Sequence, residues 1–358
     1  MLTLAVAGGG VIGRRHIALI EQNPRTRLGA LVDPAPAAAV LAAAHGVPHF
    51  ESLALMWAQA APKPDGVILA TPNGQHVAGA LECLRHATPA LIEKPLADRL
   101  DAARNLLAAL QGSTLPMLVG HHRRHSTVLG EARRVVASGE LGRIVSVSGT
   151  ALFCKPDAYF EAGPWRTRIG AGPILINLVH EIDNLRFLCG EITAVQAMAS
   201  NAVRGFEVED SAAITLRFAS AALGSFSLSD SAAAPRSWEQ TSGEDKAYAR
   251  YADQDCCFIA GTQGSLAVPT LRRWRFEGLR SWHEAMAVDA VPFEAADPLA
   301  RQLDHFCDVI DGRCAPWVSV DDAARSLSVT LAVVQAVQTG RTVAPEAMAG
   351  PASALVAA

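Results

Sequence analysis

Residues 2–13 read LTLAVAGGGVIG, an apolar run that passes directly into a cluster of glycines. This pattern predicts a buried strand over residues 2–7, a tight turn, and a helix over residues 11–21. The same alternation continues, with strands expected at 28–32, 66–70, 90–92 and 117–119 and helices at 35–44, 75–85 and 98–110. Short apolar strands that alternate with helices indicate βαβ crossovers and a parallel sheet covered on both faces. We therefore predict an α/β fold that begins with a doubly wound domain over residues 1–122.

The glycine cluster fits a loop that binds a dinucleotide. Residues 8–13, GGGVIG, match the pattern G-x-G-x-x-G after a strand and at the start of a helix. In this pattern Gly8 permits the tight turn, Gly10 lets the backbone approach a pyrophosphate, and Gly13 allows close packing of helix on strand. The N-terminus of the helix also offers N–H groups to the anion. Glycines that serve only a turn are the alternative, but we predict cofactor contacts from Gly8, Gly10, Val11, Ile12 and Gly13.

Asp33 indicates which dinucleotide is bound. It stands 33 − 13 = 20 residues after Gly13, at the end of the second predicted strand. A carboxylate at this place accepts hydrogen bonds from the ribose hydroxyls and repels the 2′-phosphate of NADP. Proteins that bind that phosphate usually offer an arginine, whereas Pro34 follows here. We therefore predict NAD as the cofactor in preference to NADP.

The pattern changes in the second half of the chain. Closely linked strands of an antiparallel sheet are expected at 144–153, 193–200, 212–218, 223–229 and 265–268, and helices at 174–189, 298–310 and 320–338. The charge-dense residues 230–255 are interpreted as a surface loop. We predict a second α/β domain with a large open, mainly antiparallel sheet over residues 123–342, followed by a flexible tail over 343–358.

Composition excludes several classes of function. The chain has 358 residues, of which 50% are hydrophobic and 18% are charged, and its net charge is −4. This balance argues against disorder and against a broad nucleic-acid surface, and no apolar stretch is long enough to span a membrane.

The seven cysteines show no C-x-x-C spacing, and the cluster HHRRH at 121–125 is expected to line a cleft or pair with acids rather than bind metal. We see no signal peptide and expect free thiols and a cytoplasmic protein.

With these motifs assembled, the chain resembles the glucose-fructose oxidoreductase, inositol dehydrogenase and rhizopine catabolism family (Gfo/Idh/MocA). The resemblance extends from Leu4 to about Val343 and rests on ATPN at 70–73, EKPL at 93–96, Trp165-Arg166, HEID at 180–183, GTQGS at 261–265 and VIDG at 309–312. It implies a Rossmann domain, a second domain whose open sheet packs against another subunit, and a homodimer or homotetramer. It also implies reversible oxidation of a secondary alcohol on a sugar, polyol or cyclitol substrate.

The resemblance also implies binding roles. Substrates of the family sit between the two domains, against the nicotinamide. The residues Thr71, Pro72, Asn73 and His76 would lie by the cofactor, and Glu93 would lie near the nicotinamide ribose. Pro95 in such a motif is often cis, which would aim Lys94 into the cleft. Trp165 and Arg166 would lie over the cleft, although Trp165 could equally serve ordinary packing.

Oxidation of a secondary alcohol needs a base that removes the hydroxyl proton and a hydrogen-bond donor that stabilises the developing alkoxide. Lys94 follows an apolar strand at the carboxyl edge of the sheet, where ligands of doubly wound folds bind. His180 is the candidate base, and Asp183, three residues later on the same helix face, could orient the imidazole or form an ion pair elsewhere. Members of the family commonly have an aspartate four residues before the histidine, where this chain has Ile176. The neighbouring Asn177 could hydrogen-bond to substrate or to Lys94, but it carries no proton at neutral pH.

Two other classes of function remain open. One is a non-catalytic sensor that binds dinucleotide and sugar to regulate a partner. The other is a glycosidase that uses tightly held NAD for a transient oxidation. The presence of both Lys94 and His180 favours an NAD-dependent dehydrogenase that acts on CH–OH groups.

Overall fold

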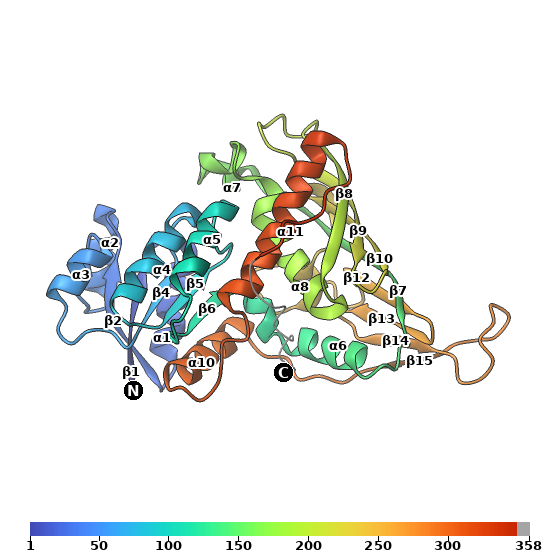
Figure 1. Cartoon of the computed structure of the whole chain (residues 1–358), viewed down its shortest axis with the longest axis horizontal. Helices are drawn as coiled ribbons and strands as arrows, with labels where there is room; N and C mark the ends of the chain where they lie inside the picture. The colour runs from blue at the N-terminus through green and yellow to red at the C-terminus, as the bar shows by residue number, and fades with distance from the viewer. Residues whose placement is uncertain (349–358) are drawn as a thin grey trace. The chain divides into compact units, whose positions relative to one another are not determined.

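The computed structural model describes residues 1–348, which form two compact units (Figure 1). The first unit comprises residues 1–122 and 298–327, together with Met348. The second comprises residues 123–297 and 328–347. No helix in the described part of the chain is both long enough and apolar enough to cross a bilayer.

The first unit is built on a parallel sheet. Within residues 1–348, this sheet has six strands in the order β3-β2-β1-β4-β5-β6. The strands are β1 (Leu2–Ala7), β2 (Thr26–Val32), β3 (His49–Phe50), β4 (Gly66–Leu69), β5 (Ala90–Glu93) and β6 (Met117–Gly120). The helices of residues 1–122 are α1 (Val11–Gln22), α2 (Pro36–Ala44), α3 (Leu53–Gln59), α4 (His76–Arg85) and α5 (Leu100–Ala109). The predicted doubly wound sheet is confirmed, although the short β3 and α3 were not anticipated.

The strand order explains where a ligand would bind in the first unit. The chain runs outward from β1 to β3 and then returns to β4 on the other side of β1, so the direction of winding reverses between β1 and β4. Side chains of β4 and β5 are buried throughout, as expected for strands covered on both faces. In such sheets the crevice at the reversal, outside the carboxyl ends of the strands, is the usual binding place.

A helix from late in the sequence completes the first unit. Helix α10 (Pro298–Ile310) packs on α1 and places Phe306 and Ile310 against Gly66 of β4. A Cβ added to Gly66 would lie 2.7 Å from Ile310 Cδ1 and 3.1 Å from Phe306 Cζ, so this contact is close. Arg25 reinforces it through an ion pair with Asp308 at 2.7 Å. From the sequence, these late residues were expected in the second domain.

The second unit is built on a mixed sheet. Within residues 1–348, it contains nine strands, eight of them in the order β15-β14-β13-β12-β7-β10-β9-β8, with β11 paired to β7. Only the β10–β7 pairing is parallel, so the prediction of a mainly antiparallel sheet is confirmed. The strands are β7 (Ile144–Cys154), β8 (Ile192–Ser200), β9 (Ser211–Phe218), β10 (Leu223–Ser229), β11 (Ser231–Arg236), β12 (Cys257–Gly261), β13 (Gly264–Val268), β14 (Arg272–Arg275) and β15 (Ala287–Ala290).

Helices cover one face of this sheet. Apolar side chains of α6 (Thr127–Ala137), α8 (Val179–Cys189) and α11 (Val320–Thr339) join the inward-facing residues of β7, β8, β9, β10, β12 and β13 in one core. Helix α11 belongs to this unit from Ser328 onward. The shorter helices are α7 (Asp157–Glu161) and α9 (Trp238–Ser242).

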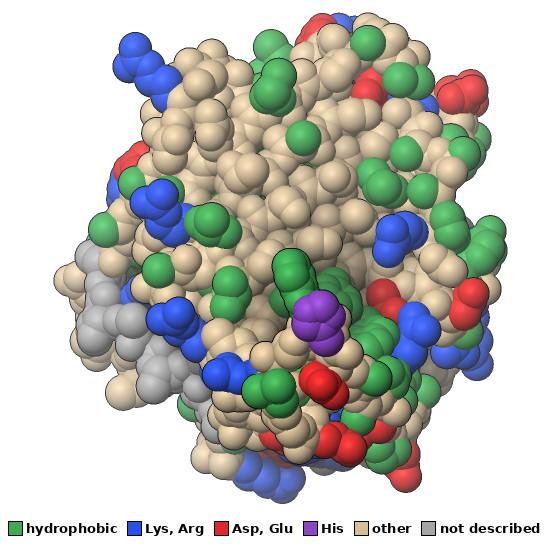
Figure 2. Space-filling model, turned by 90° about the vertical axis from the view of Figure 1, so that its right-hand side faces the viewer, with side chains coloured by type: hydrophobic (Ala, Val, Ile, Leu, Met, Phe, Trp, Pro, Cys, Tyr) green, Lys and Arg blue, Asp and Glu red, His purple; other side chains and the backbone are tan. Residues whose placement is uncertain are grey.

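The opposite face of the sheet carries the outward-pointing side chains of the alternating strands. Many outward positions are small and polar, among them Ser146, Ser148, Thr193, Gln196, Thr215, Ser225 and Ser227, while Met198, Leu223 and Phe258 are exposed apolar residues on strands of the same sheet. Figure 2 faces this side and shows hydrophobic side chains scattered among tan atoms in its upper half and more of them around a histidine in its lower half. Regular alternation of apolar and polar residues produces the polar positions on this face, because each strand turns them outward.

Residues 230–255 are not simply the surface loop that we predicted. They contain β11 and α9, and both Asp230 and Trp238 are buried. The prediction took the high charge of the segment as a sign of exposure to solvent. Several of its charged groups are instead paired inside the protein. Glu239, for example, accepts a hydrogen bond from the buried Arg123 at 2.6 Å.

The start of the predicted tail is attached to the second unit. Val343 and Val195 exchange two backbone hydrogen bonds, of 2.8 and 2.9 Å, and the carbonyl of Glu346 accepts a bond from Ser328 Oγ at 2.8 Å. The rest of that tail, residues 349–358, lies outside the described residues.

Candidate active site

The glycine loop between β1 and α1 has no room for side chains at two of its positions. Gly8 has a φ of +102°, which favours glycine, and a Cβ there would lie 2.3 Å from the carbonyl oxygen of Ala70. A Cβ on Gly13 would lie 1.9 Å from the carbonyl oxygen of Gly8. The roles predicted for these two glycines, a tight turn and close packing of the helix, agree with this geometry.

Gly10 differs from its neighbours because it borders open space. No atom lies within 4 Å of a Cβ built on it, and the side chain of the following Val11 is 87% exposed. The first N–H groups of any α-helix have no partner within the helix. Gly10, the N-cap of α1, has no side chain that could cap these groups. An open helix N-terminus lined by glycine fits the pyrophosphate of a dinucleotide.

Asp33 stands beside this loop with both carboxylate oxygens oriented. Oδ2 accepts a hydrogen bond from the N–H of Gly9 at 2.7 Å, and Oδ1 accepts one from the N–H of Ala35 at 2.8 Å. Each carboxylate oxygen has a second lone pair, so both can still accept a bond from a ribose hydroxyl. The loop and Asp33 together fit the phosphate and ribose groups of a dinucleotide.

His76 joins the two loops that follow β4 and β5. Its Nδ1 lies 2.7 Å from the carbonyl oxygen of Pro95, and its Nε2 lies 2.8 Å from that of Thr71. The side chain is buried, and burial lowers the pKa of the imidazole in spite of these two carbonyls. In this position His76, predicted to lie by the cofactor, fixes the Thr71 loop against the loop that carries Lys94. Pro72 and Asn73 lie in the first of these loops, between β4 and α4.

Glu93, at the end of β5, is buried against α1. Its Oε1 lies 2.8 Å from Nε2 of His16, and both side chains are almost inaccessible to solvent. Burial alone would raise the pKa of Glu93, but the hydrogen bond and charge of His16, together with the charge of Lys94, hold it well below its ordinary value. Glu93 was predicted to lie near the nicotinamide ribose, and no motif pointed to His16 as its partner. The Lys94–Pro95 peptide bond is cis, as the resemblance implied.

In the second unit, the three predicted catalytic residues Asn177, His180 and Asp183 lie along one helical segment. A π-helical turn (Ile174–Leu178) contains Asn177 and leads directly into α8, which carries His180 and Asp183. Turns of this kind are rare and are found frequently at functional sites. His180 is 7% exposed, so its ring is largely enclosed.

Ion pairs from the HHRRH cluster hold α8 in place. Arg124 donates two hydrogen bonds to Asp183, and Arg123 donates to Glu181 at 2.6 Å. Of the two roles considered for Asp183, the ion pair is therefore present. Burial raises the pKa of Glu181, and the charge of Arg123 offsets this in part. The expectation that these arginines pair with acids is confirmed, and residues 1–348 contain no cluster of three His, Cys, Asp or Glu able to hold a metal.

Trp165 and Arg166 form a more exposed part of the second unit. The indole of Trp165 is 54% exposed. The guanidinium of Arg166 lies 4.0 Å above the ring of Tyr159 and donates to the Tyr159 carbonyl. These contacts hold Arg166 within its own unit, and a contact with cofactor or substrate remains a prediction.

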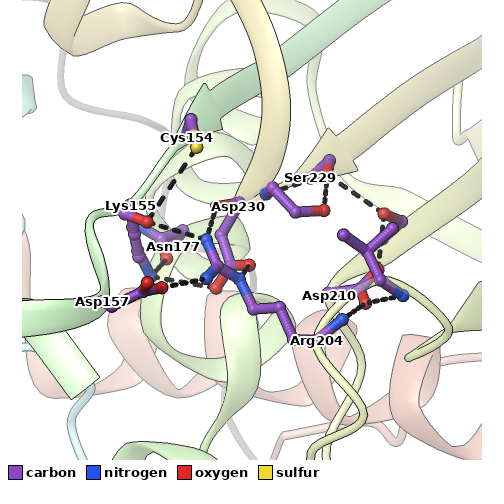
Figure 3. A network of polar contacts seen from close by, with 11 residues as sticks. Cys154, Lys155, Asp157, Asn177, Arg204, Asp210, Ser229 and Asp230 are labelled. Carbon is purple, nitrogen blue, oxygen red and sulfur yellow. Dashed lines mark hydrogen bonds and ion pairs between the residues drawn. The ribbon is translucent and has the colours of Figure 1, made fainter. Parts of the chain in front are cut away.

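A polar network next to Asn177 was not anticipated from the sequence (Figure 3). Lys155 Nζ donates a hydrogen bond to Asn177 Oδ1 at 2.7 Å and lies 3.6 Å from Oδ2 of Asp230. Arg204 also contacts Asp230, through Nε to Oδ1 at 2.8 Å. The scarcity of lysine is the one sequence signal that could have pointed to Lys155. The chain has only four lysines, at positions 63, 94, 155 and 246.

The fold and the glycine loop define a class, the oxidoreductases that bind NAD or NADP in a Rossmann domain. Residues 2–121 match the family model of oxidoreductases with an NAD-binding Rossmann fold (GFO_IDH_MocA), and residues 129–267 match the GFO/IDH/MocA C-terminal domain. The chain therefore belongs to the Gfo/Idh/MocA family.

Individual relatives are distant. The chain is 27% identical over 282 residues to the 1,5-anhydro-D-fructose reductase of Ensifer adhaerens, covering 78% of this chain and 79% of that protein. It is 24% identical over 291 residues to the scyllo-inositol 2-dehydrogenase (NAD(+)) of Bacillus subtilis, covering 79% and 78%. Among solved structures, the WlbA dehydrogenase of Bordetella pertussis, in complex with NADH and UDP-GlcNAcA, superposes with a TM-score of 0.77 at 24% identity, covering 97% and 99%.

Proposed function

We propose that the protein is an NAD-dependent dehydrogenase that oxidises a secondary alcohol of a sugar, polyol or cyclitol. The observation that carries this proposal is the open glycine-lined N-terminus of α1 with the oriented carboxylate of Asp33 beside it. The preference for NAD rests on that carboxylate, because it would repel a 2′-phosphate. The substrate class rests on family membership and on the names of the relatives, which include dehydrogenases of inositols.

In this proposal the protein supplies binding and proton transfer. The nicotinamide, when bound, accepts the hydride from the carbinol carbon. Gly10, Val11, Ile12 and Gly13 hold the pyrophosphate through backbone N–H groups, and Asp33 accepts from the ribose. Gly8, whose own N–H donates to the Val32 carbonyl at 2.8 Å, provides the tight turn beside the cofactor. The loops at the ends of β4 and β5 contribute further contacts through Thr71, Pro72, Asn73 and Glu93.

We propose that Lys94 and His180 serve the same reaction. The Lys94 ammonium donates a hydrogen bond to the reacting oxygen and so stabilises the developing alkoxide. An imidazole nitrogen of His180 accepts the hydroxyl proton. Arg124 and Asp183 keep α8, and with it His180, in a fixed position, while Trp165 and Arg166 limit access of water to the substrate.

A substrate panel tests the proposal. The purified protein with NAD or NADP would be incubated with myo-inositol, scyllo-inositol, levoglucosan, D-glucose and D-gluconate, and NADH formation followed at about 340 nm. We expect net reduction of NAD with at least one of these compounds. Cofactor that remains bound through gel filtration without net NADH formation would instead support a glycosidase. Binding of NAD and sugar with neither property would support a sensor.

A further inference from the structure

Lys155 occupies a position that the protein fixes from several sides. It directly follows β7, and its side chain is only 11% exposed. Its backbone N–H donates to the carbonyl of Asp230 at 2.8 Å, and its own carbonyl accepts from Arg204 Nη2 at 2.9 Å. The ammonium lies 4.8 Å from the centre of the Tyr159 ring. Backbone, carboxylate and aromatic contacts together determine where this ammonium points.

The network around Lys155 is anchored by a carboxylate inside the protein. Asp230 is 2% exposed and contacts two cations, with Oδ1 bound to Arg204 and Oδ2 facing Lys155. Arg204 in turn lies 4.5 Å above the ring of Phe160. Asp210 holds the turn that presents Arg204 by accepting from its backbone N–H at 2.9 Å. A charge cluster enclosed to this degree gives each member a defined geometry.

The chemistry of the ammonium determines how Asn177 is oriented. A lysine ammonium has three donors and no acceptor, so the amide atom 2.7 Å away must be the oxygen. This contact engages one lone pair of Asn177 Oδ1 and fixes the amide so that Nδ2, with its two donor hydrogens, points to the other side. Among residues 1–348, none accepts a hydrogen bond from that Nδ2, and the Asn177 side chain is not fully buried. Asn177 thus presents an N–H donor that the protein does not use.

We propose that Lys155 is a positioning residue that locks Asn177 as a hydrogen-bond donor to a substrate oxygen. This inference rests on the proposed function, in which Asn177 contacts the substrate. It adds a specificity: the substrate group at Asn177 is an acceptor oxygen, such as a carbonyl, carboxylate, ether or hydroxyl lone pair. Because an amide is not protonated at neutral pH, Asn177 in this role binds the substrate and does not replace the carboxylate that Ile176 lacks.

The orientation of Asn177 can be tested without any substrate. The chain contains six asparagines, Asn23, Asn73, Asn105, Asn177, Asn184 and Asn201, so selective ¹⁵N labelling gives few side-chain NH₂ signals. The signal of Asn177 is assigned by its loss in Asn177→Ala. We expect Lys155→Met to shift or broaden this signal and the matched control Lys246→Met, at an exposed position, to leave it unchanged. An Asn177 signal that is identical in Lys155→Met and wild type would overturn the proposal.

The consequence for the substrate is tested by a double-mutant cycle with the best compound of the panel. We expect Lys155→Met to raise KM roughly tenfold with a smaller effect on kcat, because it frees the amide to rotate. In the Asn177→Ala background the same change should have almost no further effect on KM. If the increase of KM in the double variant equals the product of the increases in the two single variants, Lys155 acts independently of Asn177. Should Lys155→Met fail to fold, Lys155→Gln, whose amide both donates and accepts, replaces it in both experiments.

The two experiments separate failure of this inference from failure of the proposed function. If no panel compound is oxidised, the proposed function fails, while the NMR signal still reports whether Lys155 orients Asn177. If a compound is oxidised and the Asn177 signal does not respond to Lys155→Met, the dehydrogenase stands and the positioning role is wrong.

Discussion

The guanidinium of Arg124 donates to both carboxylate oxygens of Asp183, from Nε to Oδ2 over 2.6 Å and from Nη2 to Oδ1 over 2.8 Å. Both side chains are buried, and the guanidinium also lies 4.6 Å above the ring of Phe187. A bidentate pair of this kind fixes the rotation of α8 as well as its distance from the Arg124 turn. The pair is therefore expected to matter first for stability and only through stability for catalysis.

We predict that Asp183→Asn destabilises the protein by about 3–5 kcal/mol, because it removes the negative charge that compensates the buried Arg124. The measurement is urea unfolding followed by circular dichroism. As a control, Glu131→Gln breaks an exposed ion pair with Arg134 and should change stability by less than about 0.5 kcal/mol. Equal effects of the two substitutions would contradict a special role for the Arg124–Asp183 pair.

The oriented carboxylate of Asp33 predicts cofactor preference. NAD should bind at least about tenfold more tightly than NADP, since the 2′-phosphate would approach a fixed negative charge. Asp33→Ser should narrow this ratio, whereas Asp101→Ser, at an exposed position on α5, should not. Isothermal titration calorimetry with both dinucleotides gives the ratio directly. Equal or tighter binding of NADPH to the wild-type protein would refute the assignment.

Lys94→Ala should reduce turnover by roughly a hundredfold or more while leaving the affinity for NAD nearly unchanged. The physical reason is that the ammonium is proposed to act on the reacting oxygen and not on the dinucleotide. Steady-state kinetics and an NAD titration on the same preparation separate the two effects. Turnover at the wild-type level in the variant would remove Lys94 from the mechanism.

For His180, the pH profile of kcat/KM is the informative measurement. If His180 accepts the hydroxyl proton, oxidation by the wild-type enzyme rises with pH through one ionisation, and His180→Ala loses both that ionisation and most of the rate. His45→Ala, which removes a histidine paired with Glu21, serves as the control. A profile that survives His180→Ala would make Lys94 the leading candidate for the base.

His76 predicts how stability depends on pH. Because burial lowers its pKa, the folded protein binds a proton at this site less readily than the unfolded chain. The stabilising contribution of the neutral ring is therefore complete above the unfolded pKa, about 6.5, and declines as the pH falls below it. Between pH 7 and pH 5 the melting temperature of wild type should fall more steeply than that of His76→Gln. Parallel slopes for the two proteins would contradict this role.

Local patterns were sufficient to predict most of the fold. The glycine loop and the alternation of apolar strands with helices determine the parallel sheet, because they depend on residues close in sequence. The second sheet was also predicted in kind, although β11, β12, β14 and β15 were missed. Arg273 on β14 and Asp289 on β15 pair at 2.8 Å, and a strand stabilised by exposed ion pairs has no apolar signature.

The candidate site could be predicted only in part, because its partners are far apart in sequence. His16 and Glu93 are separated by 77 positions and Arg123 and Glu239 by 116, so no local pattern links them. The segment around His180 was predicted as a uniform helix, whereas a π-helical turn precedes α8. The homodimer or homotetramer, the cytoplasmic location and the roles of the individual site residues remain predictions.

The position of α10 has a consequence for how the protein is made. The ribosome releases the residues of the N-terminal sheet long before residues 298–310, which cover Gly66 of β4 with the fully buried Phe306. Until then the nascent chain lacks the cover that Phe306 and Ile310 give to Gly66. The cofactor domain is therefore expected to mature only after residues 298–310 have been synthesised, and a fragment that ends at residue 122 would need a surrogate for this helix to remain soluble.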